Sequence, residues 1–117
     1  MIKLQTDKGL IRIGSSAFRR LVGDAVTSCF GVRGMAMRSK ADGLVHLLKR
    51  ESMDKGVYIT NLDDTTVSID LHIIVRQGVN IPVVCSSIIR EVTYKVTKET
   101  GVNIDSVNVY VDSIVLN

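Results

Sequence analysis

Two histidines are the first side chains of this chain to consider for catalysis or metal binding. Neither His46 nor His72 has another histidine three or four residues away, the spacing that builds a metal site on one helix. His72 alternates with apolar neighbours on the outward side of a predicted strand, with no base expected beside it. We therefore expect both to be surface or packing residues, and we predict no metal site.

Serine and aspartate pairs offer no clearer chemistry. Ser15 and Ser16 precede an apolar helical pattern, so one of them is expected to cap a helix. Asp63 and Asp64 fall at a predicted hairpin tip, where solvation would leave the pKa of each carboxyl too low for acid catalysis. We predict no catalytic residues and no cofactor, and a hydrolase or kinase subunit is the least favoured class.

The two cysteines, Cys29 and Cys85, form neither a C-x-x-C motif nor a disulfide framework. Both occupy apolar positions of helical patterns, which favours small core residues in a reducing cytoplasm.

Charge is unevenly distributed along the chain. Residues 1–56 carry 11 Lys/Arg against 5 Asp/Glu, whereas residues 57–117 carry 4 against 7, so the halves have net charges of +6 and −3. Such asymmetry indicates a basic face for an anionic partner, oppositely charged faces that pair, or a chance distribution of charge on a small surface. The predicted partner-binding residues are Arg19, Arg20, Arg33 and Arg38. An acidic face is expected on the last helix at Glu91 and Glu99, and self-association is expected to be partly electrostatic.

A second functional class comes from Gly31-Val32-Arg33-Gly34, the G-x-x-G that clamps nucleic-acid backbone in KH domains. In that alternative the loop joins two helices, and Arg33 and Arg38 contact phosphates. The stretch after Met35 begins no clean helix, and we consider nucleic-acid binding the less favoured function.

The elements that position these residues fit one α+β domain over residues 1–117. The chain is 45% hydrophobic, enough for a core of its own, and it has no apolar run long enough to span a membrane. We predict a two-layer sandwich with helices on one face of a small mixed sheet, in the order β-α-(short α)-β-β-α-β. The expected strands are 9–13, 57–60, 67–75 and 107–111, and the expected helices are 15–29, 42–55 and 80–100.

Several short patterns occur together in an order that resembles the alkaline shock protein (Gls-type) envelope stress family of Gram-positive bacteria. They are Gly9-x-Ile11-x-Ile13, Gly31-Val32-x-Gly34-Met35, residues 67–81 and residues 100–111. The segment from Asp42 to Val57 is similar to the YloU-like branch of that family. Gln77 and Gly14 depart from the family pattern at turn positions.

The resemblance implies a non-enzymatic cytoplasmic interaction or scaffold protein linked to envelope stress or to fatty-acid and lipid homeostasis. It implies self-association, or docking near the membrane through a membrane-anchor protein. A fatty-acid kinase encoded nearby is a further partner that it implies.

Overall fold

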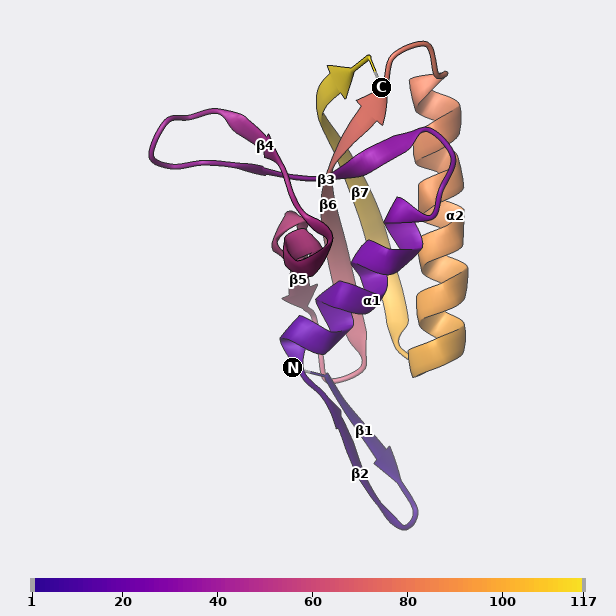
Figure 1. Ribbon diagram of the computed structural model, residues 1–117. Coiled ribbons are helices and arrows are strands. Elements are labelled where there is room, and N and C mark those ends of the chain that lie inside the picture. The colour runs from indigo at the N-terminus through magenta and orange to yellow at the C-terminus, as the bar shows by residue number, and fades with distance from the viewer. Residues whose placement is uncertain (1, 117) are drawn as a thin grey trace.

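The computed structural model describes residues 2–116, and strand β6 (Thr66–Arg76) is the centre of its main sheet (Figure 1). β7 (Asn103–Val115) pairs with β6 in parallel along its whole length. β5 (Val57–Asn61) and β3 (Val32–Arg38) pair antiparallel with successive parts of β6. Because β7 occupies one edge of β6 throughout, β5 and β3 must share the opposite edge, and β7 is an edge strand of a mixed sheet.

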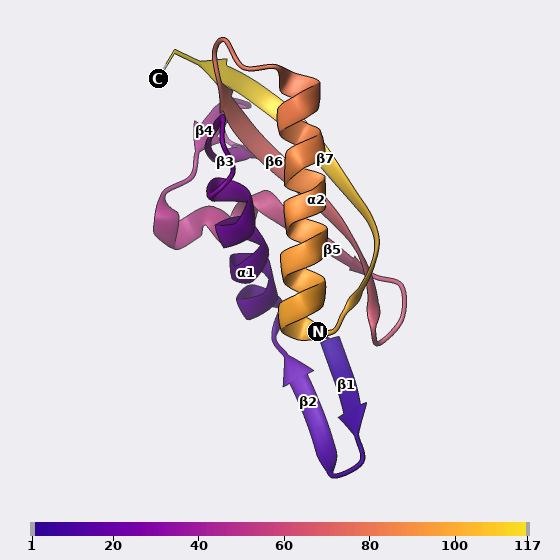
Figure 2. The same cartoon turned by 90° about the vertical axis from the view of Figure 1, so that its right-hand side faces the viewer.

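Two helices, α1 (Ser15–Thr27) and α2 (Ile81–Thr100), lie on the same side of this sheet (Figures 1 and 2). The predicted α+β fold class is therefore confirmed. Asn80 begins α2 by accepting a hydrogen bond from the Val83 backbone N–H at 3.2 Å, with Pro82 in the first turn. Gly101 ends it in the left-handed region at φ 74°.

The core lies between the helices and the sheet. Alternate residues of β6 are buried, as their spacing predicts. They pack against residues of α2 that are four positions apart and lie on one face of that helix. These buried residues are Val67, Ile69, Leu71, Ile73 and Val75 of β6 with Val84, Ile88, Val92 and Val96 of α2. From α1 come Phe18, Val22, Ala25 and Val26, whereas their neighbour Leu21 is only half-buried.

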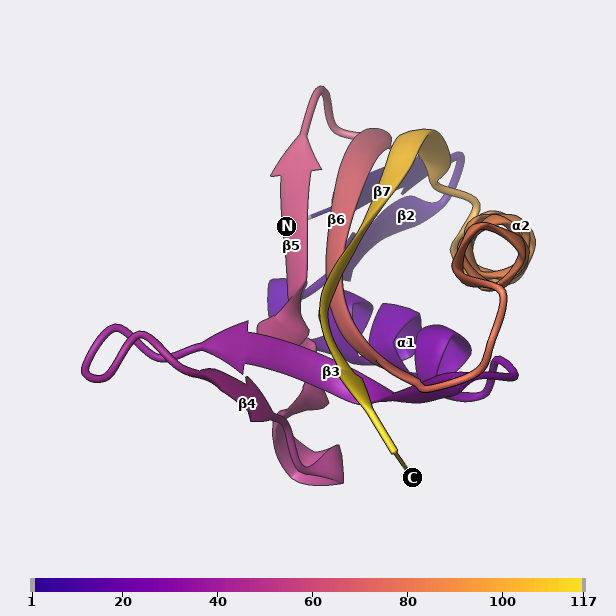
Figure 3. The same cartoon turned by 90° about the horizontal axis from the view of Figure 1, so that it is seen from above.

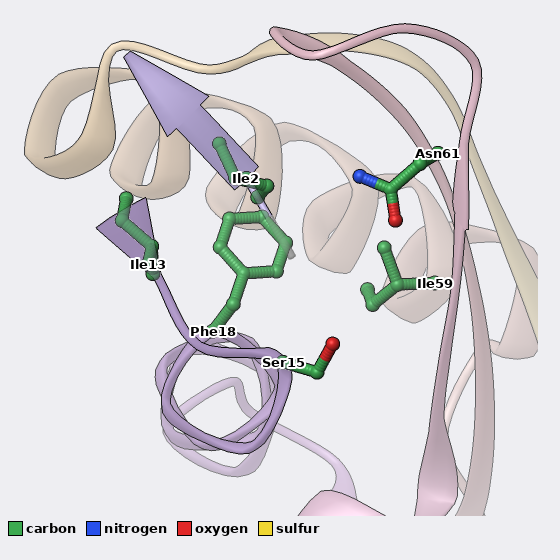
Figure 4. A pocket seen from close by; sticks show the side chains of 6 residues that line it. All are labelled: Ile2, Ile13, Ser15, Phe18, Ile59 and Asn61. Atoms are coloured by element: carbon green, nitrogen blue, oxygen red, sulfur yellow. The ribbon is translucent and has the colours of Figure 1, made fainter. Parts of the chain in front are cut away.

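A hairpin of β1 (Ile2–Thr6) and β2 (Gly9–Ile13) projects from the sandwich (Figures 1 and 2). The strand at 9–13 was predicted, but its partner β1 was not. The base of the hairpin is anchored where Ile2 and Ile13 pack around Phe18 of α1 and Ile59 of β5 (Figure 4). The cavity between them measures only about 10 Å³, so this junction is closely packed.

The predicted short helix over residues 42–55 is wrong. Asp42 does not cap a helix: its carboxylate accepts the Leu44 backbone N–H at 2.9 Å within a turn. The apolar residues that follow form β4 (Val45–Leu47), which pairs with β3. Only the end of the segment is helical, as the 3₁₀ helix η1 (Arg50–Gly56). Strand pairing with β3 thus overrides the local helical spacing.

Candidate functional site

Two of the predicted partner-binding arginines make contacts within the fold. Arg20 of α1 donates to the backbone carbonyls of Arg50 at 3.3 Å and of Glu51 at 2.6 Å. Its neighbour Arg19 lies 3.8 Å from the Asp54 carboxylate. Both therefore connect α1 to η1, a contact between segments some 30 residues apart that the sequence pattern does not reveal.

The other two arginines, Arg33 and Arg38, lie on strand β3. Arg38 donates to the Gly43 carbonyl at 2.6 Å, which closes the loop between β3 and β4. That loop projects away from the sandwich (Figures 1 and 3). Arg33 lines a pocket beside Arg50 at the start of β3. The structure thus divides the four arginines between two structural contacts, a projecting loop and a pocket.

The face of the sheet away from the helices carries a polar ladder between β6 and β7. The Ser68 and Ser106 hydroxyls are 2.7 Å apart. One strand step further, the Asn108 amide donates to the Asp70 carboxylate at 2.9 Å. These bonds join parallel strands that are 38 residues apart in the chain.

His72 continues this ladder, and the prediction that it has no partner is wrong. Its Nδ1 lies 2.9 Å from an Asp112 carboxylate oxygen, and both side chains are largely covered. The imidazole stacks on Tyr110 at 4.9 Å and 14° and meets the edge of Tyr58 at 5.2 Å and 82°. Sequence spacing missed this cluster because its members come from three strands, β5, β6 and β7.

Tyr58 and Tyr110 are each about half-exposed, 50% and 47%, although they flank a half-buried histidine. Half-exposed tyrosines on a flat face are typical of protein interfaces, where the ring contributes apolar area and the hydroxyl a hydrogen bond. The two rings come from β5 and β7, so only the tertiary structure brings them together.

The G-x-x-G segment does not have the KH arrangement. Gly31 turns the chain at φ 87°, and the residues from Val32 onward form strand β3. The loop therefore joins a helix to a strand and not to a second helix, which removes the geometry that the alternative required.

The remaining candidate residues lie apart from one another. His46 is in β4, where its Nε2 is 3.3 Å from the Asp42 carboxylate. Asp63 is exposed, and the Thr65 backbone N–H lowers the pKa of its carboxyl. Ser52 and Lys55 have the Ser-x-x-Lys spacing, but both fall within η1, where Lys55 is exposed.

The cysteines are free thiols, each half-buried at the margin of the core. Burial, and secondly the Glu91 carboxylate, raise the pKa of the Cys29 thiol. Burial alone raises the pKa of the Cys85 thiol. A raised pKa keeps a thiol protonated near neutral pH, so both are weak nucleophiles.

The expected acidic face of α2 is of mixed charge. Glu91 and Glu99 line one shallow groove, but Lys95 and Lys98 lie between them in it. Lys98 also places its ammonium 5.6 Å from the centre of the Tyr94 ring. The two glutamates therefore do not present a continuous negative surface.

Neither helix within residues 2–116 has the length and apolar character that crossing a membrane requires. In the same part of the chain, no three side chains of the metal-ligating types gather closely enough to hold an ion.

The fold and these surfaces define a small α+β domain whose polar, tyrosine-bearing sheet face is left uncovered by its helices. The chain belongs to the Asp-23 family, described as having a cell envelope-related function, and the family model matches residues 3–116. The resemblance to alkaline shock proteins is thereby confirmed, together with a role related to the cell envelope.

The chain aligns with three relatives over most of the length of each. The chain is 33% identical to the uncharacterized protein YloU of Bacillus subtilis over 114 residues, covering 97% of this chain and 94% of YloU. It is 34% identical to the uncharacterized protein Spy1614 of Streptococcus pyogenes, with 97% and 93% covered. Spy1535 of the same organism is 30% identical, with 92% and 80% covered. No solved structure matches the chain.

Proposed function

We propose that the chain is a non-enzymatic cytoplasmic scaffold that self-associates in the service of the cell envelope, near the membrane and in connection with envelope stress or lipid homeostasis. The observation that carries the self-association is the free edge of β7. Within residues 2–116 this strand pairs with β6 alone, so its other edge presents unpaired backbone groups over 13 residues.

The middle of this edge is open to pairing. Relative to β6, β7 has a one-residue bulge at Asp105 and another at Asp112. Bulges and charges are the devices that protect sheet edges, and both occur here only at the ends of the regular stretch. Residues 106–111 between them are regular and carry no charge.

A second copy of β7 is complementary to this edge. Antiparallel pairing centred on Val109 places Val107 of one copy opposite Val111 of the other, and Asn108 opposite Tyr110. No aspartate then faces an aspartate. The result is a symmetric dimer in which one sheet continues through both copies and the tyrosine-bearing faces form one surface.

The proposal predicts a mass above that of the monomer in light scattering at increasing protein concentration. The double variant Asn108→Lys/Tyr110→Lys places ammonium groups opposite each other across the dimer axis, so it should be monomeric. The control Ser86→Lys/Thr97→Lys adds the same charge at exposed positions of α2 and should associate like the parent.

Salt distinguishes edge pairing from attraction between charged faces. At 1 M salt the screening length falls to about 3 Å, which dissolves assemblies held by surface charge and leaves backbone pairing intact. A dimer that dissociates in 1 M salt would contradict edge pairing. A parent chain that stays monomeric at every concentration would refute self-association, leaving docking onto a separate membrane-anchor protein or a fatty-acid kinase.

A further inference from the structure

A pocket of about 210 Å³ lies where the end of α1, the start of β3 and η1 meet, away from the β7 edge. Arg33 and Arg50 line it together with three apolar side chains, Met35, Leu48 and Met53. The combination of two cations with an apolar lining is the feature that the proposed self-association does not use.

Arg33 is directed to this pocket by a bulge in β3. Val32 faces Val75 and Gly34 faces Ile74, so two consecutive residues of β6 oppose three of β3. Arg33 is the additional residue, and it is exposed while both of its neighbours are buried. A bulge leaves one residue of the strand unpaired and changes the direction of its side chain, and bulges are therefore common beside binding sites.

Arg50 is brought to the same place by η1. Its backbone carbonyl accepts the Arg20 guanidinium at 3.3 Å, which fixes the start of η1 against α1. Its own guanidinium, like that of Arg33, has no hydrogen-bond or ion-pair partner among the described residues. By contrast, Arg19, Arg20 and Arg38 are all engaged within the fold.

The apolar part of the lining is held in place by close packing. Met35 and Met53 are almost completely buried, and Leu48 is half-buried. A Cβ at Gly23 of α1 would lie 3.2 Å from the Met53 side chain, so the absence of that atom lets η1 approach α1. Leu48 therefore presents most of the apolar surface that a ligand can reach, and the two methionines support it from below.

We propose that this pocket binds a soluble organic anion in which a carboxylate or phosphate group is attached to a small apolar body. Guanidinium groups bind both anions through paired charge-assisted hydrogen bonds, and the leucine beside them contacts the apolar portion. The volume is below the 300 Å³ or so of pockets for drug-sized molecules, so the ligand is small.

The other polar groups at the pocket do not reverse this preference. The Thr27 hydroxyl donates to the Gly23 carbonyl at 2.9 Å, so its proton is not available to a ligand. The end of α1 contributes about half a negative charge, less than the two positive charges of the guanidiniums.

Phenyl phosphate is a suitable probe, and NMR titration of the full chain measures its dissociation constant and locates it. We expect it to bind more tightly than either inorganic phosphate or phenol, because only phenyl phosphate engages both the arginines and the apolar lining. Arg33→Gln and Arg50→Gln should each weaken binding about tenfold or more, as expected for hydrogen bonds to a charged group. Arg12→Gln removes from β2 an exposed arginine that has no partner within residues 2–116, and this variant should bind like the parent.

Four results would overturn the proposal. The first is that millimolar phenyl phosphate produces no shifts at the pocket, and the second is that it binds no more tightly than inorganic phosphate. The third is that phenyl phosphate binds Arg33→Gln and Arg50→Gln as tightly as Arg12→Gln, with all three variants melting like the parent. The fourth comes from sedimentation with vesicles of phosphatidylcholine and phosphatidylglycerol. If the chain binds these vesicles through the two arginines but does not bind phenyl phosphate, the pocket belongs to a lipid-binding surface.

Discussion

Truncation of Ile88 and of Leu21 to alanine tests which faces of the two helices form the core. Both changes remove three carbon atoms, but Ile88 is fully buried between α2 and the sheet, whereas Leu21 of α1 is half-buried. The two substitutions therefore differ in burial and not in chemistry, and each is the control for the other.

The burial of each side chain determines the expected loss in the free energy of unfolding. At about 0.8 kcal/mol per buried methylene, the lost transfer free energy at Ile88 is about 2.4 kcal/mol. The cavity that remains raises the cost of Ile88→Ala to about 3–4 kcal/mol, within the usual range for such truncations. Leu21→Ala loses about half of the transfer term and leaves no closed cavity, so its cost is about 1 kcal/mol.

Urea unfolding followed by circular dichroism measures both values, with an unchanged m-value as evidence that the unfolded state is not altered. In a thermal scan, at about 4 °C per kcal/mol for a domain of this size, the midpoint should fall by about 12–16 °C for Ile88→Ala and by about 4 °C for Leu21→Ala. Equal losses, or a larger loss for Leu21→Ala, would refute the assignment of the buried face of α1.

Three further changes test other parts of the fold. Gly56→Ala should destabilise the chain by about 1–3 kcal/mol, because its Cβ would lie 3.0 Å from a backbone oxygen. Gly9→Ala, with open space around it, should be neutral or slightly stabilising in the same unfolding assay; a similar loss in both would contradict the packing argument. Asn80→Ala removes the cap of α2 and should cost about 1 kcal/mol in urea unfolding, while an unchanged midpoint would show that the cap contributes nothing. His72→Gln should cost about 1 kcal/mol through the lost bond to Asp112, and a midpoint within error of the parent would show that the pair is not stabilising.

The sequence by itself determined strand β6 and helix α2. The alternation of β6 and the stripe of α2 identify the faces that are buried, because side chains repeat every two residues in a strand and about every 3.6 in a helix. The family resemblance followed from short patterns in order along the chain. Both kinds of signal are local, and the structure and the family match agree with them.

Tertiary structure alone decided the rest. Residues 44–48 have a spacing that suits a helix, but β3 offers them a strand partner, and the hydrogen bonds of that pairing are absent from any local pattern. Contacts from distant parts of the chain also decide the different roles of the four arginines. Whether each is a structural contact or a free cation depends on backbone carbonyls and carboxylates brought to it from elsewhere in the fold, as the Arg50 carbonyl is to Arg20 across 30 residues.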